Sequence, residues 1–274
     1  MKKLLILILP VLAFWSCQDV VELDLPEGDV LLVIDGQITD QPGETYVYLS
    51  ETVPYFDEEG NPPVPGATIS LFEDDALVSI FIEPEPGFYL SSYVGTTEKS
   101  YRIEVELADG RRYSSESELL PRVPPIDSVY CRFETDLQFL DDGYYVYFAT
   151  QELPGQPEFY RWKFYFNSVY QNTPFDIQLA NDDFVDGNYI SEFAVSFDPF
   201  LVGDTVVVEQ YSTSRAYYYY WNLIATQTAQ VGGPFDPPPA PVIGNITSLS
   251  STDEVVLGYF SAHGLATGQT IVEE

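Results

Sequence analysis

The chain has 274 residues, of which 11 are Lys or Arg and 43 are Asp or Glu, giving a formal net charge of −32. So acidic a protein is not expected to bind nucleic acid, because contact with the phosphate backbone needs a basic surface. Hydrophobic residues make up 45% and aromatic residues 15% of the chain, which supports a packed core and argues against disorder. No sequence motif indicates a cofactor.

Residues 1–16 have the pattern of a secretory signal peptide. Lys2 and Lys3 precede an apolar run from Leu4 to Trp15, which as a helix of about 18 Å is too short to cross a bilayer. Cys17 follows directly and looks like the cysteine of a lipobox, whose thiol is diacylated. The sequence therefore predicts a lipoprotein with palmitate or a similar acyl chain on Cys17. A chance cysteine beside ordinary cleavage near Ala13 is the alternative.

Residues 17–28 form an acidic, lipidated tether. Without residues 1–16 the chain has 9 Lys and Arg against 43 Asp and Glu, a net charge of −34, so the acyl chain rather than charge would hold it at a membrane. Acidic residues after a lipidated cysteine resemble the surface-export signals of Bacteroidota lipoproteins, but a soluble spacer explains them equally well. The sequence thus leaves cell surface and periplasmic face open.

Residues 29–121 alternate in period two with frequent turn breaks, which predicts short strands. The expected strands are Val30 to Ile34, Tyr46 to Leu49, Ala67 to Phe72, Leu77 to Ile82, Phe88 to Leu90, Tyr101 to Leu107 and Arg111 to Tyr113. This number of strands in so short a segment indicates an Ig-like or prealbumin-like β-sandwich. Several of its motifs are also similar to carboxypeptidase-regulatory-like modules.

A proline-rich hinge, Pro121 to Pro125, separates this segment from a β-rich C-terminal domain at residues 122–274. Its expected strands are Ser128 to Phe133, Tyr144 to Thr150, Phe159 to Phe166, Tyr189 to Phe197, Thr205 to Tyr211 and Val255 to Phe260. Cys131 is expected to be a small buried side chain, without a disulfide partner if Cys17 is acylated. One amphipathic helix is predicted over residues 214–231. The predicted fold class is therefore mainly β with one helix.

The order of several short motifs resembles a known family. The motifs are Val33-Ile34-Asp35-Gly36, Pro65-Gly66-Ala67, Gly87-Phe88-Tyr89, Pro124-Pro125-Ile126-Asp127-Ser128, Gly244-Asn245-Ile246 and Gly258-Tyr259-Phe260. Together they resemble the Bacteroidota lipoproteins of domain of unknown function 4249, over essentially the whole mature chain. The resemblance implies an outer-membrane lipoprotein, often encoded beside a TonB-dependent receptor. It carries over no catalytic or ligand-binding residue.

Little in the sequence favours an enzyme. His263 is the one histidine, and it follows the last expected strand, which predicts a solvent-exposed turn. No Gly-x-Ser-x-Gly motif is present, and no Cys/His pair has the spacing of a known site. Spacing alone leaves open a glycosidase built from two distant carboxylates. Asp182, Asp183 and Asp186 are weak calcium candidates, although a self-bonded Asx turn explains them more simply.

Two residues are candidates for binding a partner or ligand. Tyr219 lies on the helix face that a core does not need, and Phe235 lies in the stiff loop from Pro234 to Pro241. The same loop could instead cover a sheet edge. The expected function is that of a non-enzymatic accessory or ligand-binding component of a TonB-dependent uptake system. The alternatives are a cell-surface hydrolase that uses carboxylates and an adhesion or envelope-assembly module.

Overall fold

The computed structural model describes residues 29–54, 60–155, 158–183, 187–229 and 241–274. Cys17, the tether, Asp186 and Phe235 lie outside these residues, so the predictions for them stay predictions. The strands and helices of the described residues are β1 (Leu32–Thr39), β2 (Thr45–Glu51), β3 (Thr68–Glu73), β4 (Ala76–Ile80), β5 (Ile82–Glu85), β6 (Phe88–Ser91), β7 (Ser100–Glu106), β8 (Arg112–Ser115), β9 (Glu118–Leu119), β10 (Ile126–Glu134), β11 (Gly143–Gln151), β12 (Phe159–Phe166), β13 (Val169–Tyr170), the 3₁₀ turn η1 (Pro174–Asp176), β14 (Gln178–Asn181), β15 (Tyr189–Ala194), β16 (Thr205–Thr213), α2 (Arg215–Thr228), β17 (Ile246–Ser248) and β18 (Phe260–Ile271).

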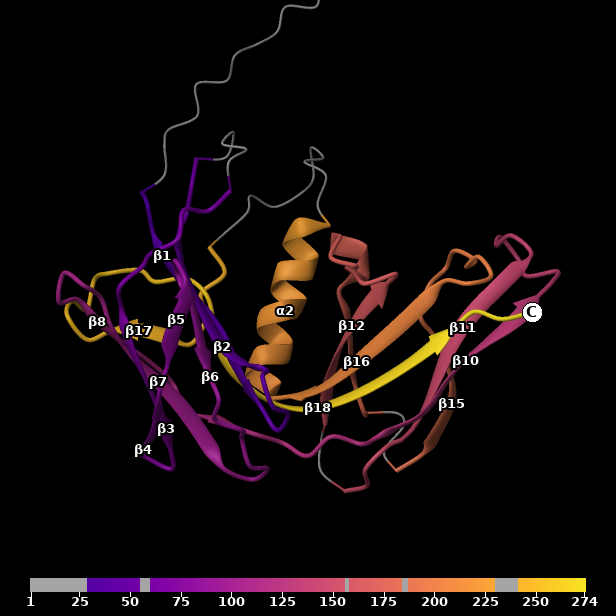
Figure 1. Ribbon diagram of the computed structural model, residues 1–274, viewed down its shortest axis with the longest axis horizontal. Coiled ribbons are helices and arrows are strands. Elements are labelled where there is room, and N and C mark those ends of the chain that lie inside the picture. The colour runs from indigo at the N-terminus through magenta and orange to yellow at the C-terminus, as the bar shows by residue number, and fades with distance from the viewer. Residues whose placement is uncertain (1–28, 55–59, 156–157, 184–186, 230–240) are drawn as a thin grey trace, which may run out of the picture.

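Among the described residues, nine strands form one sheet in the order β13-β12-β16-β18-β1-β2-β6-β5, with β14 added beside β12; we call it the central sheet. Its longest strand, β18, pairs in parallel with β1 at its start and antiparallel with β16 beyond Gly264. Figure 1 shows β18 running from one side of the molecule to the other. The central sheet therefore joins two lobes through continuous backbone hydrogen bonds.

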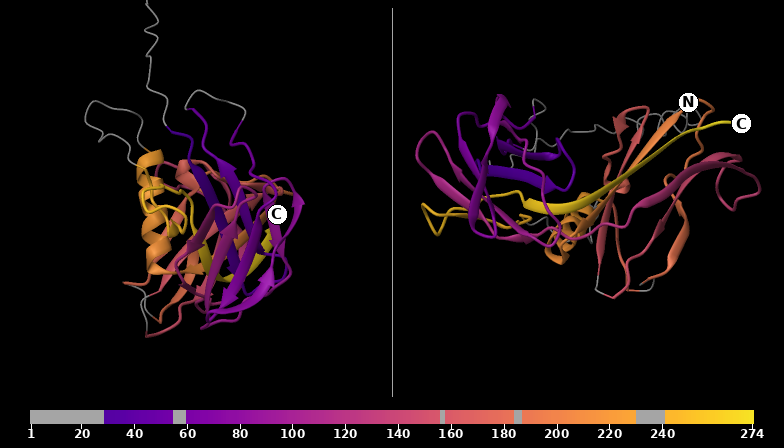
Figure 2. Two further views of the ribbon diagram at one scale, coloured as in Figure 1. Left: turned by 90° about the vertical axis from the view of Figure 1, so that its left-hand side faces the viewer. Right: turned by 60° about the horizontal axis from the view of Figure 1, so that its bottom comes forward.

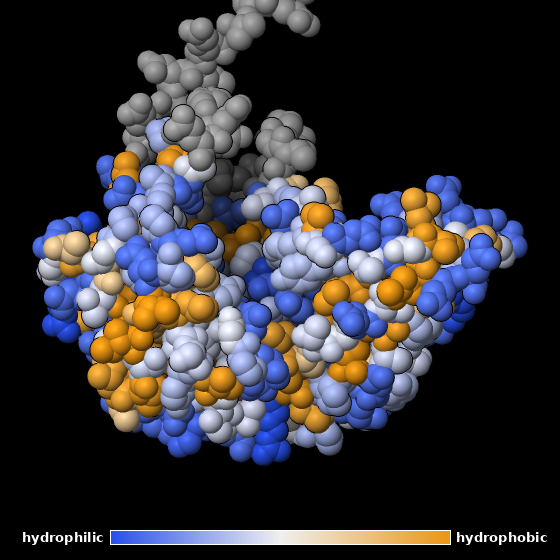
Figure 3. Space-filling view, viewed as in Figure 1, coloured by the Kyte–Doolittle hydropathy of each residue, from blue (hydrophilic) through white to orange (hydrophobic). Residues whose placement is uncertain are grey.

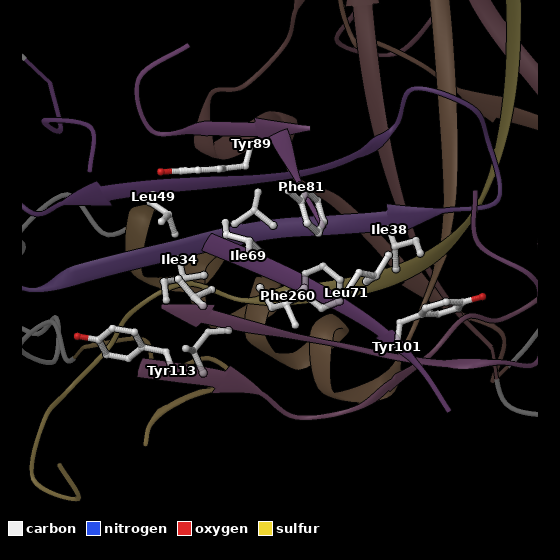
Figure 4. Close-up of a cluster of buried hydrophobic side chains, with 14 of the residues drawn as sticks. Ile34, Ile38, Leu49, Ile69, Leu71, Phe81, Tyr89, Tyr101, Tyr113 and Phe260 are labelled. Atoms are coloured by element: carbon white, nitrogen blue, oxygen red, sulfur yellow. The ribbon is translucent and has the colours of Figure 1, made fainter. Parts of the chain in front are cut away.

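The first lobe is a two-layer sandwich. Strands β1, β2, β5 and β6 of the central sheet face a second sheet of order β17-β8-β7-β3-β4, and their inward side chains form the core drawn in Figure 4. Ile34, Ile69 and Phe260 in this core are fully buried. Alternation of apolar and polar residues located most of these strands. However, β1 runs from Leu32 to Thr39 rather than from Val30 to Ile34, and the expected strand from Leu77 to Ile82 is divided into β4 and β5. The assignment of the sandwich to an Ig-like or prealbumin-like class stays a prediction.

The second lobe packs the other end of the central sheet against a three-stranded sheet, β10-β11-β15. Trp162 and Phe164 of β12 face this core, as the period of that strand predicts. Cys131 lies in β10 as expected, but its side chain is half-buried rather than buried. The described part of the chain thus contains two apolar clusters, one in each lobe.

The C-terminal part of the chain returns to the first lobe. Asn245 is buried, and its side chain accepts from the backbone N–H of Phe260 at 2.9 Å and donates to the carbonyl of the same residue at 2.8 Å. Gly258 has φ of +95° and lies so close to Ile34 that a Cβ would come within 2.1 Å of its carbonyl oxygen. The glycine and asparagine motifs near the C-terminus therefore dock this segment on β1.

Two expectations about the C-terminal segment are wrong. The last strand is Phe260–Ile271, not Val255 to Phe260. Leu257 makes only an isolated parallel bridge to Val33, Gly258 then interrupts the strand with φ of +95°, and continuous pairing with β1 starts at Phe260. His263 consequently lies inside that strand with 1% of its surface exposed, rather than in a solvent-exposed turn. A histidine between glycine and alanine in an apolar strand gave no periodic signal for this placement.

Helix α2 follows β16 directly, and its first turn is capped by the Ser214 hydroxyl, which accepts from the backbone N–H of Tyr217 at 3.1 Å. The views in Figures 1 and 2 place α2 against one face of the central sheet. Tyr217 is the buried residue of the helix and contacts the ring of His263 at 4.7 Å. The predicted mainly β fold with one α-helix is confirmed for the described residues. None of their helices is long and apolar enough to span a membrane.

A polar cleft between the lobes

A cavity of about 200 Å³ lies between α2 and the central sheet, and we call it the central cleft. Figure 3 shows that the surface is hollowed where the two lobes meet. The residues that line the central cleft are Asp35, Gly36, Gln37, Tyr46, Arg161, Lys163, Tyr170, Tyr217, Trp221 and Ser261. Three other depressions in the described residues are larger, between 410 and 450 Å³, but none is lined by a cation.

The central sheet brings these residues together from distant parts of the sequence. Arg161 of β12 pairs with Tyr211 of β16, and three strand spacings separate β12 from β1, which bears Asp35. In a flat sheet that separation would be about 14 Å. The sheet curves between the lobes, as Figure 1 shows, so that Arg161 and Asp35 line one small cavity.

Arg161 is the most deeply buried charge of the cleft, with 5% of its surface exposed. Its guanidinium donates to the hydroxyls of Tyr217 at 2.9 Å and Tyr170 at 3.4 Å. It also stacks on Trp221, with its central carbon 3.4 Å from the ring centroid. These aromatic partners disperse the charge without neutralising it, since an arginine stays protonated in a protein.

The absence of a carboxylate partner sets Arg161 and Lys163 apart. Of the nine Lys and Arg in the described residues, six form ion pairs with Asp or Glu: Lys99, Arg102, Arg111, Arg112, Arg122 and Arg132. The other three are Arg161, Lys163 and Arg215, and only the first two line the central cleft. In a chain with so many acids, two enclosed cations without a contacting carboxylate are unusual, because burying an unpaired charge costs free energy.

Lys163 lies two residues further along β12 and projects from the same face. Its ammonium donates to the Tyr211 hydroxyl at 3.3 Å. Burial lowers the pKa of Lys163 to about 8, and the neighbouring positive charge of Arg161 lowers it further. Lys163 is therefore mostly protonated at pH 7 and loses its charge over the next two pH units.

Asp35 is the one carboxylate among the residues that line the cleft. Its side chain is exposed to solvent inside the cleft, yet the walls around it desolvate the carboxyl group and raise its pKa. Arg161 and Lys163 oppose this shift but lie beyond ion-pair distance of it in the described structure. Asp35 can therefore accept hydrogen bonds from a ligand without first breaking a salt bridge.

Two further hydrogen-bond donors stand at the wall formed by α2. The Tyr217 hydroxyl accepts from Arg161, and burial raises the pKa of Tyr217, so it keeps a proton that it can donate. The Trp221 Nε1–H is buried near the Tyr217 hydroxyl but makes no hydrogen bond of normal geometry within the described structure. Buried donors are usually satisfied, so an unpaired one in a cavity wall suggests a missing acceptor.

His263 does not supply acid–base chemistry to the cleft. Burial lowers its pKa to about 3, and Lys163 and Arg161 add to the effect. Its Nδ1 lies 3.3 Å from the carbonyl oxygen of Ser212, and its ring packs against Tyr211 and Tyr217. The histidine is thus a neutral spacer between β18 and α2.

A second group of titratable side chains lies outside the central cleft. The Tyr160 hydroxyl lies between the carboxyl groups of Glu152, at 2.5 Å, and Glu158. Burial raises the pKa of Glu158 to about 7, and Glu152 contributes to the shift. Tyr160 has one proton for two acceptors, so a proton held on Glu158 satisfies the second contact.

Of the residues predicted from sequence, Tyr219, Asp182 and Asp183 are described by the structure, and none of these three lines the cleft. Tyr219 is 52% exposed on the outer side of α2, near Arg215. Asp182 is buried, and Asp183 is exposed and accepts from the side chain of Asn181 at 2.7 Å. Within the described residues no group of three or more His, Cys, Asp or Glu could hold a metal ion.

Sequence reasoning overlooked the cations of β12. Arg161 and Lys163 flank Trp162, so their period of two places them on the face opposite the apolar one. The sequence pattern could have identified them, because two of the few cations of the mature chain lie on one face of a strand whose other face packs in the core. Which side chains lie opposite them could not be read from the strand itself.

The described residues define a mainly β protein with two lobes and a charged, aromatic cleft between them. The chain is a member of the family described as Domain of unknown function (DUF4249), whose model matches residues 18–269. No curated protein shows detectable sequence similarity to it.

Proposed function

We propose that this protein is a non-enzymatic, ligand-binding outer-membrane lipoprotein that serves as an accessory component of a TonB-dependent uptake system. The observation that carries the binding role is the central cleft, in which charged and aromatic residues of five strands and α2 surround a cavity. Ligand sites in proteins are commonly concave, with aromatic walls and a few well-placed polar groups. The lipid anchor and the uptake system rest on the pattern around Cys17 and on the family resemblance.

The composition of the central cleft favours ligand binding over the two alternatives, a hydrolase that uses carboxylates and an adhesion or envelope-assembly module. A hydrolase that uses two carboxylates needs both within one cleft, and Asp35 alone lines this one among the described residues. The pair Glu152 and Glu158 is occupied with Tyr160 instead. An adhesion module would favour an exposed apolar patch over an enclosed polar cavity.

Native mass spectrometry of the protein purified from its own membranes tests the binding role. We expect a small molecule to be retained by the wild-type protein and by Tyr219→Ala, whose side chain lies outside the cleft. We expect Trp221→Ala, which removes a cleft wall, to lose it. Retention of no molecule, or equal retention by Trp221→Ala, would contradict the proposal.

Metabolic labelling with an azido-palmitate tests the anchor. Wild-type protein should be labelled and Cys17→Ala should not. Cross-linking in intact cells then tests the uptake role, with a TonB-dependent receptor as the expected product. Equal labelling of both proteins would overturn the lipoprotein assignment, and a cross-linked set without any such receptor would overturn the accessory role.

A further inference from the structure

We propose that the ligand of the central cleft carries a carboxylate, which binds to Arg161 and Lys163. The same ligand carries a second group, which donates a hydrogen bond to Asp35. This inference rests on the proposed binding function and assigns its ligand to a chemical class, the small amino acids and hydroxy acids.

Neither Arg161 nor Lys163 has a carboxylate of the described residues within ion-pair distance, although acids act on them from further away. Arg161 is nearly inaccessible to bulk water, and its contacts are two tyrosine hydroxyls and an indole ring. Burying a charge without a counter-charge is costly, so proteins that do so usually bind the missing partner. A guanidinium that lines a cavity matches the geometry of a carboxylate.

The neighbouring donors add to this preference. The Tyr217 hydroxyl proton and the Trp221 Nε1–H lie beside Arg161, and neither is committed to another acceptor in the described structure. Donors of three side chains gathered at one wall favour a group with several lone pairs. A carboxylate oxygen pair meets that requirement, whereas an ammonium or an apolar group could accept from none of them.

The other charges near the cleft favour a singly charged anion over a phosphate dianion. Asp35 on β1, Glu44 on β2 and Glu209 on β16 all act on Lys163 through space, and Glu209 already accepts from Tyr211 at 2.7 Å. His263 on β18 is neutral. With all three acids ionised, Arg161 and Lys163 leave no excess positive charge. The raised pKa of Asp35 favours its neutral form, which would balance the two cations against Glu44 and Glu209, so a dianion is disfavoured more than a monoanion.

Asp35 gives the ligand its second group. It lines the side of the cavity formed by β1, across from Arg161 on β12, and it is accessible to solvent there. Tyr46, from the neighbouring strand, lines the same side, so a flat or cyclic body would fit between the two polar ends. The ligand thus has a carboxylate at one end and an amine or hydroxyl at the other.

Isothermal titration of the mature protein with 4-(aminomethyl)benzoate, benzoate and benzylamine tests the inference. We expect 4-(aminomethyl)benzoate to bind most tightly, and benzoate to bind at least about tenfold more tightly than benzylamine. Arg161→Gln should lower the affinity for both carboxylates about tenfold or more. Arg215→Gln serves as the matched control, since that cation is exposed and outside the cleft. Benzylamine binding as tightly as benzoate, or Arg161→Gln binding like wild type, would overturn the inference.

A second measurement does not depend on Arg161. Affinity for benzoate should fall as pH rises from 7 to 9, because Lys163 loses its proton, and Lys163→Arg should remove most of that dependence. An unchanged slope in Lys163→Arg would refute the role of Lys163. If native mass spectrometry finds a bound molecule without an acid group, the binding function stands and the carboxylate assignment fails.

Discussion

The two faces of β12 show how differently one strand of this protein is used. Trp162 and Phe164 face the apolar core of the second lobe, whereas Arg161 and Lys163 face the central cleft. The same division holds on β1, where Ile34 contributes to the first core and Asp35 to the cleft. Each face therefore has its own energetic role: one stabilises the fold and the other holds charges at a cost.

Aromatic rings reduce that cost. Arg161 lies over Trp221 and Lys163 over Tyr211, and such cation–π contacts replace part of the hydration that burial removes. They do not replace it fully, since the pKa of Lys163 is still lowered to about 8. Residues that lower stability in this way are commonly retained because a function needs them.

The largest expected effect is on the core face. Phe164→Ala should lower the free energy of unfolding by about 3 to 5 kcal/mol, because it removes a large buried ring and leaves a cavity. Chemical denaturation of the purified protein measures it. Phe175→Ala is the control, since Phe175 is 80% exposed and should change stability by less than about 0.5 kcal/mol. Similar losses in both would mean that this face is not core.

The cleft face should respond in the opposite direction. A lysine with a pKa near 8 in the fold and 10.5 when unfolded destabilises the protein fully below pH 8, and the effect disappears above pH 10.5. Lys163→Met should therefore raise the free energy of unfolding by about 2 kcal/mol at pH 7 and by less at pH 10. Lys99→Met is the control, because Lys99 is exposed and ion-paired, and this variant should not raise the free energy of unfolding. A loss of stability in Lys163→Met would contradict this contrast between the faces.

The carboxyl pair at Tyr160 should give a smaller effect with the same sign. The pKa of Glu158 rises from 4.5 to about 7 on folding, so its stabilising protonated form is fully present below pH 4.5 and lost as pH rises through 7. Because the group is only partly buried, Glu158→Gln should gain about 1 kcal/mol at pH 8 and nothing at pH 4. Denaturation at both pH values measures it, with the exposed Glu85→Gln as control. A gain at pH 4 equal to that at pH 8 would rule out the titration.

The smallest effect is expected at Tyr219. It is half exposed on the outer side of α2 and does not line the cleft, so Tyr219→Ala should change the free energy of unfolding by less than about 0.5 kcal/mol. Binding of 4-(aminomethyl)benzoate, measured by titration, should match that of wild type. Weakened binding would extend the site beyond the cleft, onto the surface predicted from sequence.

The positions of many strands along the chain could be read from the sequence, because burial alternates along a strand with period two. The expected span of β12 agrees with the structure to the residue, and the start of α2 was visible in the polar Ser214 before an aromatic helix. The C-terminal strand was misplaced, since Gly264 and Gly268 interrupt its apolar pattern while the pairing with β16 continues through them. The local pattern of apolar and polar residues does not predict pairing with a strand that lies far away in the sequence.

The sequence by itself determined that the chain is mainly β, that one helix follows the strand ending before Ser214, and that Trp162 and Phe164 face a core. These follow from periodicity and capping, which act between residues close in the chain. Only the tertiary structure decided that Arg161, Lys163, Asp35 and Trp221 share one cavity. Their meeting depends on the curvature of the central sheet and on the parallel pairing of β18 with β1, which connects residues more than 200 positions apart.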